Sequence, residues 1–274
     1  FVNRGHDVTV FSADGDDNLP VSTTDEGVQV RCFRSLSPDE SLYFAPQIAV
    51  AIRRADADIV HAHNYHAFPL LFAAIGVTDE RFVATTHYHG ESANGVRNAL
   101  LSGYRPLGRW AVRQADDVIA VSEWERTRVR EDFGLEATVI PNGVDVDRFA
   151  SASPEERERP YLLCVGRLEE YKGVQHAIRA LSALPEYDLV VAGSGPFREE
   201  SERIARETGV SDRVKFLGYV DGERLPRLYA GARVFVSMSS FEAYGMTVAE
   251  ALAAGTPCVV REAAALEDWS SHDG

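Results

Sequence analysis

The clearest shortage in this 274-residue chain is lysine, because only Lys172 and Lys215 among its 28 basic residues are lysines. Asp and Glu number 42, which gives a formal net charge of -14 at pH 7. Duplex nucleic acid is bound through many Lys and Arg contacts to phosphate, so this charge argues against a nucleic-acid partner. It also disfavours nonspecific adhesion to anionic lipid. A halophile-like acidic surface with little lysine suits concentrated salt, although a GC-rich genome would also favour arginine over lysine. The halophile hypothesis predicts that stability rises with molar potassium chloride.

Cysteines and long apolar runs are also scarce. Cys32, Cys164 and Cys258 lie far apart, and the last two fall in apolar strand-like runs, where a small buried thiol is the usual role. We therefore expect neither disulfides nor a zinc cluster. No apolar run approaches the ~20 residues that span a bilayer, and the start lacks a basic-then-apolar export signal. These absences lead us to expect a cytoplasmic protein.

Apolar strand-like segments alternate with helix-forming segments along the whole chain. This pattern predicts the α/β class with mostly parallel sheets. A segment rich in proline and charge, 151–160, separates two such series, and the length suffices for two domains. We expect strands at 7–11, 28–33, 57–61, 82–86, 117–121, 137–140, 161–165, 188–192, 213–216, 234–237 and 257–260. We expect helices at 46–55, 69–75, 96–113, 123–133, 174–184, 198–208, 223–230 and 247–254.

Four glycine-containing turns follow strands of the second series, at 166–173, 193–196, 218–221 and 242–250. Carboxyl ends of parallel strands meet at one edge of a sheet, which is where ligands bind in open α/β sheets. Arg167 and Lys172 in the first turn can set a bidentate fork and a point charge against a diphosphate. The small residues of the second turn, beginning with Gly193, allow close backbone approach.

Glu242 and Glu250 flank a strand-to-helix junction and are the most informative pair. The helix is expected to begin near Gly245, where unpartnered N–H groups and the helix dipole favour a phosphate. At about 1.5 Å per residue, the two carboxylates are separated by roughly 12 Å, comparable to the reach of a nucleotide diphosphate sugar. Each could bind hydroxyls at one end of such a ligand. Paired acids on a solvated helix face are also common, so the spacing alone leaves both interpretations open.

The order of these turns, Gly-Arg-x5-Gly, Gly-Ser-Gly-Pro, Phe-Leu-Gly-Tyr-Val and Glu-x7-Glu, resembles the donor-binding half of the retaining glycosyltransferases of family four. Segments at 4–10, 58–63, 115–122 and 141–145 extend the resemblance over nearly the whole chain. It implies two Rossmann-like domains that face a central cleft, the GT-B type, incomplete at both ends. The acceptor-side domain would be 1–150, without its first strand and glycine-rich loop. The nucleotide-sugar-binding domain would be 151–274, without its C-terminal end, which we expect to stop in a loop after the last strand.

The resemblance also implies roles for individual residues. Glu242 would hold hydroxyls of the transferred sugar, Glu250 would accept the ribose hydroxyls, and His87 would face the sugar from the first domain, with His89 as the rival alignment. The implied catalytic residues are His87, Glu242, Arg167 and Lys172. The implied donor-binding residues are Gly166, Arg167, Lys172, Gly193, Val220, Asp221, Glu242, Gly245, Met246, Thr247 and Glu250, with Val220 and Asp221 at the base and Gly245 to Thr247 at the phosphate.

The implied reaction is transfer of a sugar from a nucleotide diphosphate, such as a UDP- or GDP-sugar, to an acceptor hydroxyl with retention of configuration. The protein would supply positioning and charge stabilisation, so we expect neither metal nor cofactor. The acceptor would be a glycan, a lipid-linked group or a small molecule, in cell-surface glycan or glycolipid synthesis. Peripheral contact with the cytoplasmic face of the membrane is a further expectation of the resemblance.

Two other interpretations stay open. A metal-dependent hydrolase could use His61, His63, His87 and His89. We expect each pair to supply only one ligand unless the chain turns at that point, because side chains along a strand alternate between the faces of a sheet. No supporting carboxylate lies at a convincing spacing. The third interpretation is a noncatalytic protein that binds a sugar nucleotide.

Overall fold

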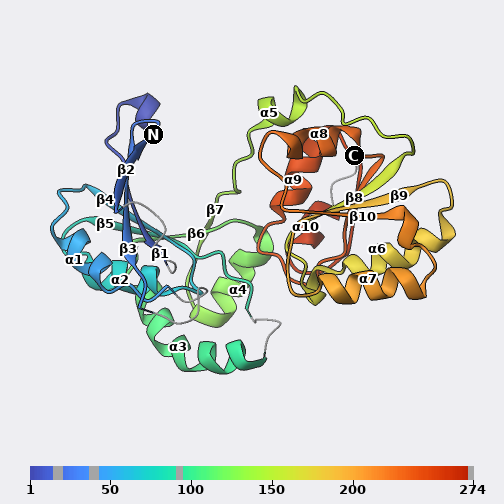
Figure 1. The fold of residues 1–274 in the computed structure, drawn as a ribbon. Coiled ribbons are helices and arrows are strands. Elements are labelled where there is room, and N and C mark those ends of the chain that lie inside the picture. Colours follow the sequence, from blue (N-terminus) through green and yellow to red (C-terminus); the bar gives the residue numbers. More distant parts are fainter. Residues whose placement is uncertain (15–20, 37–42, 91–94, 271–274) are drawn as a thin grey trace. The chain divides into compact units, whose positions relative to one another are not determined.

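The computed structural model describes residues 1–14, 21–36, 43–90 and 95–270, with the side chains of the helix at 95–113 described from residue 103 onward (Figure 1). The chain forms two compact units, Phe1–Ile140 and Pro141–Gly274. Each unit has its own parallel sheet and its own hydrophobic core. The α/β class predicted from the alternating pattern is therefore confirmed.

Unit 1 contains two sheets. The four-stranded sheet is entirely parallel and follows the chain in the order β4-β5-β6-β7. In the three-stranded sheet, β3 pairs in parallel with β1 and antiparallel with β2. The strands are β1 (Thr9–Asp14), β2 (Ser22–Asp25), β3 (Val28–Arg34), β4 (Ile59–His63), β5 (Arg81–Thr85), β6 (Asp117–Ala120) and β7 (Thr138–Val139). The predictions lacked β2, because its Ser-Thr-Thr-Asp sequence is exposed throughout and offers no apolar alternation.

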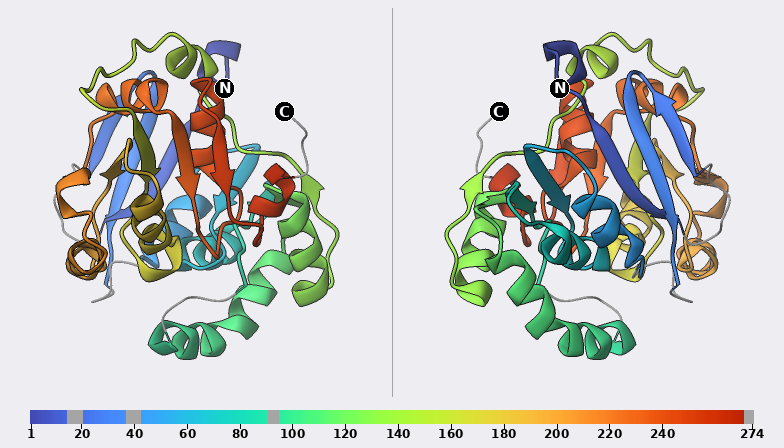
Figure 2. Two further views of the ribbon diagram at one scale, coloured as in Figure 1. Left: turned by 90° about the vertical axis from the view of Figure 1, so that its right-hand side faces the viewer. Right: turned by 90° about the vertical axis from the view of Figure 1, so that its left-hand side faces the viewer.

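Four α-helices pack with these strands, and the long helix α3 runs along the lower end of unit 1 in both views of Figure 2. Their bounds are α1 (Gln47–Arg53), α2 (Phe68–Gly76), α3 (Gly95–Arg113) and α4 (Glu123–Phe133), after a short 3-10 helix η1 (Val2–Arg4). The start of α4 is fixed by Ser122, whose side chain accepts the N–H of Glu125, and its end by Gly134 at φ 67°. Buried Leu70, Phe82 and Val129 join α2, β5 and α4 in one core.

Unit 2 has a five-stranded parallel sheet in the order β10-β9-β8-β11-β12. The strands are β8 (Tyr161–Val165), β9 (Asp188–Ala192), β10 (Val214–Gly218), β11 (Val234–Ser237) and β12 (Cys258–Val260). The chain runs outward from β8 to β10 and then crosses to the other side of β8 for β11 and β12. The strand order thus reverses between β8 and β11, and ligands of open α/β sheets bind outside the carboxyl ends of the strands at such a point.

Helices cover both faces of this sheet. Figure 1 shows α6 and α7 along one face and α8 and α9 along the other, and a separate apolar cluster lies under each pair. The helices are α5 (Val146–Ala150), α6 (Val174–Ala180), α7 (Arg198–Glu207), α8 (Arg224–Gly231), α9 (Met246–Ala253) and α10 (Leu266–Ser270), with 3-10 helices η2 (Glu170–Lys172), η3 (Leu181–Ala183) and η4 (Ser211–Arg213).

The boundary between the units lies earlier than the predicted one at residue 150. Helix α5 belongs to unit 2, because buried Phe149 contacts the ring of Tyr229 at 5.8 Å between centroids. The segment after α5 is also tied to this unit, since the carboxylate of Glu155 accepts two hydrogen bonds from Arg224, of 2.8 and 3.0 Å. The stretch 151–160 is therefore anchored to unit 2 and is not the linker that its composition suggested.

The chain after β12 also differs from the prediction of a loop. Helix α10 follows, and the indole N–H of Trp269 donates a 2.6 Å hydrogen bond to the carbonyl of Tyr244. Leu266 is fully buried in the core of unit 2. A helix this short leaves too weak a periodic signal for sequence analysis.

Within the described ranges, no helix has the length and apolar character required to cross a membrane. The three cysteines are free thiols. Cys164 lies inside the sheet of unit 2, and burial raises the pKa of its thiol to about 12, so it packs as a small neutral group.

Candidate functional site

The turns after β8 and β11 meet at the point where the strand order of unit 2 reverses. The N–H of Ser240 donates to the carbonyl of Tyr171 over 2.9 Å. A cavity of about 30 Å³ lies between the two turns. The predicted residues around it are Gly166, Arg167, Lys172, Glu242 and Thr247. The structure therefore gathers these five around one small space.

Lys172 and Glu242 are paired across this reversal point. The Nζ atom of Lys172 lies 2.6 Å from Oε1 of Glu242, and both side chains are largely buried, with 25% and 18% of their surface exposed. Sequence analysis assigned the lysine to a diphosphate and the glutamate to a sugar, but did not predict contact between them. The attraction between two opposite charges at this distance holds each side chain in place.

Glycines let the backbones of three turns touch. A Cβ atom at Gly193 would lie 1.9 Å from the carbonyl oxygen of Gly166, and one at Gly195 would lie 2.3 Å from that of Leu168. A Cβ atom at Gly173 would lie 2.3 Å from the carbonyl oxygen of Met238. The sequence predicts close backbone approach for the turn that begins at Gly193, and here main chain meets main chain. At Gly166 itself, no described atom lies within 4 Å of the Cβ position, so this side of the turn is open.

Helix α9 begins directly after the loop that carries Glu242. Gly245 precedes it in the left-handed conformation at φ 94°, and no side chain of the described region caps its first N–H groups. Met246 is exposed, whereas Gly245 is buried against Leu266 of α10. The start of α9 therefore keeps backbone donors and the positive end of a dipole free for an anion.

Glu250 lies one turn further along α9 and is fixed by residues that sequence analysis missed. The hydroxyl of buried Tyr229 donates a 2.8 Å hydrogen bond to its Oε2 atom. Burial raises the pKa of Glu250, and the Tyr229 hydroxyl and the charge of Arg148 oppose that rise. Neither contact could be predicted, because Arg148 and Tyr229 come from α5 and α8, and no local pattern links them to α9.

Arg167 lines the cavity with an exposed side chain, whereas Val220 and Asp221 do not line it. Arg167 is 68% exposed and pairs with Glu169 at 2.5 Å. Asp221 follows β10 and accepts the N–H of Arg224 at the start of α8, over 2.8 Å. Val220 is half-buried and packs on the core beneath α8 and α9. Contact of Val220 and Asp221 with a base stays a prediction.

Histidines gather in unit 1 at the carboxyl ends of β4 and β5. The rings of His61 and His63 lie 4.3 Å apart, and Nδ1 of His63 is 3.2 Å from Nε2 of His87. Our expectation that each His-x-His pair supplies only one ligand is wrong for His61 and His63, because residues two apart on a strand point to the same face. Burial and the neighbouring His63 and His61 lower the pKa of His87 to about 4.

The rival histidine belongs to a second group. His89 stacks on buried His66 with ring centroids 4.1 Å apart. Across the described ranges, no three His, Cys, Asp or Glu side chains come together in a geometry suited to a metal ion. The position of His87 relative to Glu242 stays a prediction, since the two residues lie in different units.

Glu125 holds the backbone on both sides of His87. Its fully buried carboxylate accepts the hydroxyl of Thr86 and the N–H of Tyr88, as well as the N–H of Val121 at 2.6 Å. His87 itself has φ 45°, a conformation uncommon outside glycine that often marks functional positions. Sequence analysis missed Glu125, although the Ser-x-x-Glu pattern from Ser122 is a recognisable capping signal.

Two family profiles cover the chain. The profile described as Glycosyltransferase Family 4 matches residues 1–148, and that described as Glycosyl transferases group 1 matches residues 145–270. A glycogen synthase of Mycobacterium tuberculosis is 35% identical over 212 residues, covering 74% of this chain and 51% of that protein. A GDP-mannose-dependent phosphatidylinositol monomannoside mannosyltransferase of Mycolicibacterium smegmatis is 35% identical over 205 residues, covering 65% and 51%. The chain thus spans about half the length of these curated relatives.

Solved structures share the fold. Sucrose-phosphate synthase from Thermosynechococcus elongatus matches with a TM-score of 0.77 and 21% identity, over 97% of this chain and 74% of that one. Anabaena HepE in complex with UDP and glucose matches with a TM-score of 0.71 and 22% identity, over 90% and 71%. The fold is that of the GT-B glycosyltransferases, as the resemblance implied. The chain belongs to glycosyltransferase family 4.

Proposed function

We propose that this chain transfers a sugar from a nucleotide diphosphate sugar to an acceptor hydroxyl, with retention of configuration and without a metal. Family membership supports the reaction class. The observation that carries the proposal is the pairing of Lys172 with Glu242 beside the uncapped start of α9, where the strand order reverses. A cation, a carboxylate and free backbone donors are the groups that a diphosphate joined to a sugar requires.

In this proposal, the bound donor breaks the ion pair between Lys172 and Glu242 and contacts both side chains itself. The leaving diphosphate binds the ammonium group of Lys172. Arg167 and the backbone of Gly245, Met246 and Thr247 complete its binding site. Glu242, released from the lysine, accepts hydrogen bonds from hydroxyls of the transferred sugar. Preorganised charges that face a developing negative charge stabilise the transition state, and this is the part of catalysis assigned to unit 2.

Glu250 would bind the ribose. A carboxylate offers two oxygens, one for each ribose hydroxyl, and the hydrogen bond from Tyr229 fixes the plane of the group. His87 would contact the transferred sugar as a neutral ring, because its lowered pKa of about 4 leaves it uncharged near neutrality. Retention requires no covalent intermediate if the departing phosphate helps to take the acceptor proton from the same face.

The names of relatives suggest donors and acceptors. HepE is described in complex with UDP and glucose, and the mycobacterial relative is named for GDP-mannose and a phosphatidylinositol mannoside. We propose a UDP- or GDP-sugar as donor and a glycan, glycolipid or small polyol as acceptor. For a glycolipid acceptor, the protein would work at the cytoplasmic face of the membrane.

The test combines binding and turnover for two variants of the same helix junction. UDP, GDP and their glucose and mannose conjugates are screened by thermal stabilisation. Glu250→Ala should weaken every nucleotide, including UDP and GDP without a sugar. Glu242→Ala should leave UDP and GDP binding nearly intact, but reduce sugar transfer and hydrolysis of the bound donor. Glu267→Ala, an exposed acid in the first turn of α10, is the matched control. Equal and negligible effects of both variants would refute ribose binding by Glu250 and sugar binding by Glu242.

A further inference from the structure

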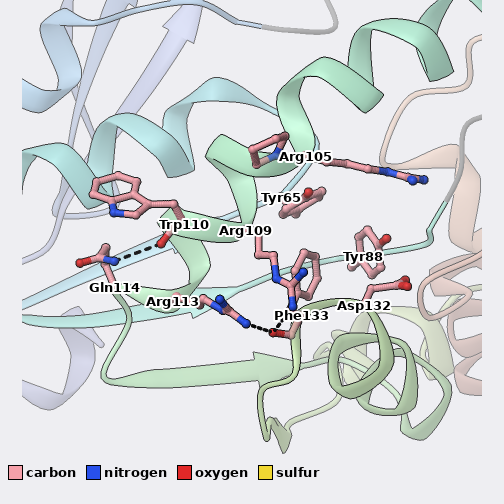
Figure 3. A pocket seen from close by; sticks show the side chains of 10 residues that line it. Tyr65, Tyr88, Arg105, Arg109, Trp110, Arg113, Gln114, Asp132 and Phe133 are labelled. Carbon is pink, nitrogen blue, oxygen red and sulfur yellow. Dashed lines mark hydrogen bonds between the residues drawn. The ribbon is translucent and has the colours of Figure 1, made fainter.

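A cavity of about 720 Å³ lies in unit 1 and is lined by arginines and aromatic rings (Figure 3). Small-molecule pockets typically enclose about 300–1,000 Å³. One wall is the end of α3 and another is the end of α4. The lining residues are Tyr65, Tyr88, Arg105, Pro106, Arg109, Trp110, Arg113, Gln114, Asp132 and Phe133. None of them belongs to the residues predicted from the sequence to bind the donor.

Three of these arginines form a row. Arg105, Arg109 and Arg113 recur every fourth residue, so they project from one face of α3. Like charges at this spacing destabilise a helix by about 0.2–0.5 kcal/mol per pair. In a chain of net charge -14, three neighbouring arginines in one cavity form a local concentration of positive charge. An anionic ligand would remove the repulsion within the row.

The internal partners of the row leave most of its donors unused. Arg113 donates a 2.9 Å hydrogen bond to the carbonyl of Phe133, and Arg109 reaches the same oxygen at 3.4 Å. Arg105 takes part in no hydrogen bond or ion pair described for this part of the chain. Asp132, the acid in the lining, already lies 3.3 Å from Arg128. Each guanidinium carries five N–H donors, so the row can still bind a phosphate bidentately.

The other walls suit a hydroxyl-bearing ring. Burial raises the pKa of Tyr65 to about 12, so its hydroxyl remains a donor near neutral pH. Trp110 is 44% exposed and offers an apolar face beside Pro106. Figure 3 shows Tyr65 and Tyr88 between α3 and the end of α4, with the guanidinium group of Arg105 extending past Tyr88.

The cavity and the histidine group share their loops. Tyr65 follows His63 after β4, and Tyr88 is the residue directly after His87 at the end of β5. A ligand whose phosphate lies on the arginines therefore sits beside the residue proposed to contact the transferred sugar. We infer that this cavity binds the acceptor, and that the acceptor carries a phosphate ester next to a sugar or polyol ring. The role of this ligand as the acceptor rests on the proposed function, whereas the binding of a phosphate ester in the cavity does not depend on it.

The experiment measures binding to the whole chain by calorimetry without donor. The probes are myo-inositol 1-phosphate, glucose 6-phosphate, myo-inositol and inorganic phosphate. At least one ester should bind about tenfold more tightly than either fragment, and Arg105→Gln and Arg109→Gln should each weaken it about tenfold. Arg53→Gln is the control, because Arg53 also lies in unit 1 and donates to a backbone carbonyl, that of Ile75. Esters that bind no better than inorganic phosphate, or equal losses in all three variants, would overturn the inference.

Two further measurements are needed. The first distinguishes a lipid headgroup from a free phosphorylated polyol, and the second distinguishes failure of this inference from failure of the proposed function. Vesicles of phosphatidylcholine with and without phosphatidylinositol are tested by flotation. Arg105-dependent capture of the anionic vesicles supports a lipid headgroup, and ester binding without such capture supports a free phosphorylated polyol. UDP and GDP binding, measured in the same variants, should not change. Ester binding without any nucleotide binding would contradict the donor assignment in unit 2 and leave the phosphate-ester site standing, without its role as acceptor site.

Discussion

Replacing Glu125 by glutamine should destabilise unit 1 although it adds no volume and removes no apolar contact. The carboxylate is fully buried, with Thr86 and Tyr88 donating to one oxygen and Val121 to the other. An amide keeps a single acceptor oxygen, so its NH2 group must face one of these donors. A buried donor left without an acceptor costs about 1–3 kcal/mol. We expect Glu125→Gln to lower the free energy of unfolding by about 2 kcal/mol.

The assay is urea unfolding at 25 °C, followed by tryptophan fluorescence, since Trp124 adjoins the mutated residue. Glu123→Gln is the matched control on the same helix. Its carboxylate is 57% exposed and pairs with Arg126 at i,i+3, so the loss should stay below about 0.5 kcal/mol. Equal losses in the two variants would refute the argument that the hydrogen bonds of Glu125 stabilise the fold.

The dependence on pH gives a second check of the same residue. Burial raises the pKa of Glu125 above its ordinary value of 4.5, and the hydrogen bonds from Thr86, Val121 and Tyr88 oppose the rise. The folded state therefore holds this proton more tightly than the unfolded state, and the resulting stability is lost as pH rises through the raised pKa. The difference in stability between the unmodified protein and Glu125→Gln should shrink as pH rises from 4.5 through the raised pKa. A difference that grows with pH would contradict the direction of the shift. Turnover of Glu125→Gln should also fall, because the carboxylate positions His87.

Other substitutions test the remaining features. Gly193→Ala should destabilise unit 2 by on the order of 3 kcal/mol in chemical denaturation, since its Cβ atom would lie 1.9 Å from a backbone oxygen. The control is Gly209→Ala, at φ 72° in open space, which should cost only about 1–2 kcal/mol in the same assay. The lowered pKa of His87, about 4, means that stability is lost as pH falls from 6.5 towards 4, and His87→Asn should flatten that slope in thermal melts at graded pH. Tyr229→Phe removes the hydrogen bond that lowers the pKa of Glu250, so the pH below which nucleotide affinity declines should move upward in calorimetric titrations; an unchanged profile would argue against ribose binding by that carboxylate.

Strands with a strong apolar signal were predictable from the sequence. The predicted strands at 161–165, 188–192 and 234–237 coincide with β8, β9 and β11, because each contains at least three consecutive apolar residues in a parallel sheet. The elements that escaped prediction are short or polar, namely β2, α5 and α10. Local propensity is weak over so few residues, and packing against the unit decides their structure.

The candidate site was predictable as a set of positions but not as a set of contacts. Residue types and order identified Lys172 and Glu242, yet these residues stand seventy apart, and only the fold shows that they pair at 2.6 Å. Tyr229 and Glu125 carry no motif that names a partner, since their hydrogen bonds cross between elements. The arginine row on α3 repeats at helical spacing, but its cavity depends on how α3 packs beside α4.

The glycine contacts between turns have a consequence for redesign of this protein. At Gly173, Gly193 and Gly195, the space that a side chain would need is filled by the main chain of a neighbouring turn. A mutant library that randomises these positions would mostly yield misfolded proteins and would report little about which sugar is preferred. Directed evolution of that preference should instead vary side chains that already project into open space, with Met246 as a first choice because it is exposed at the start of α9.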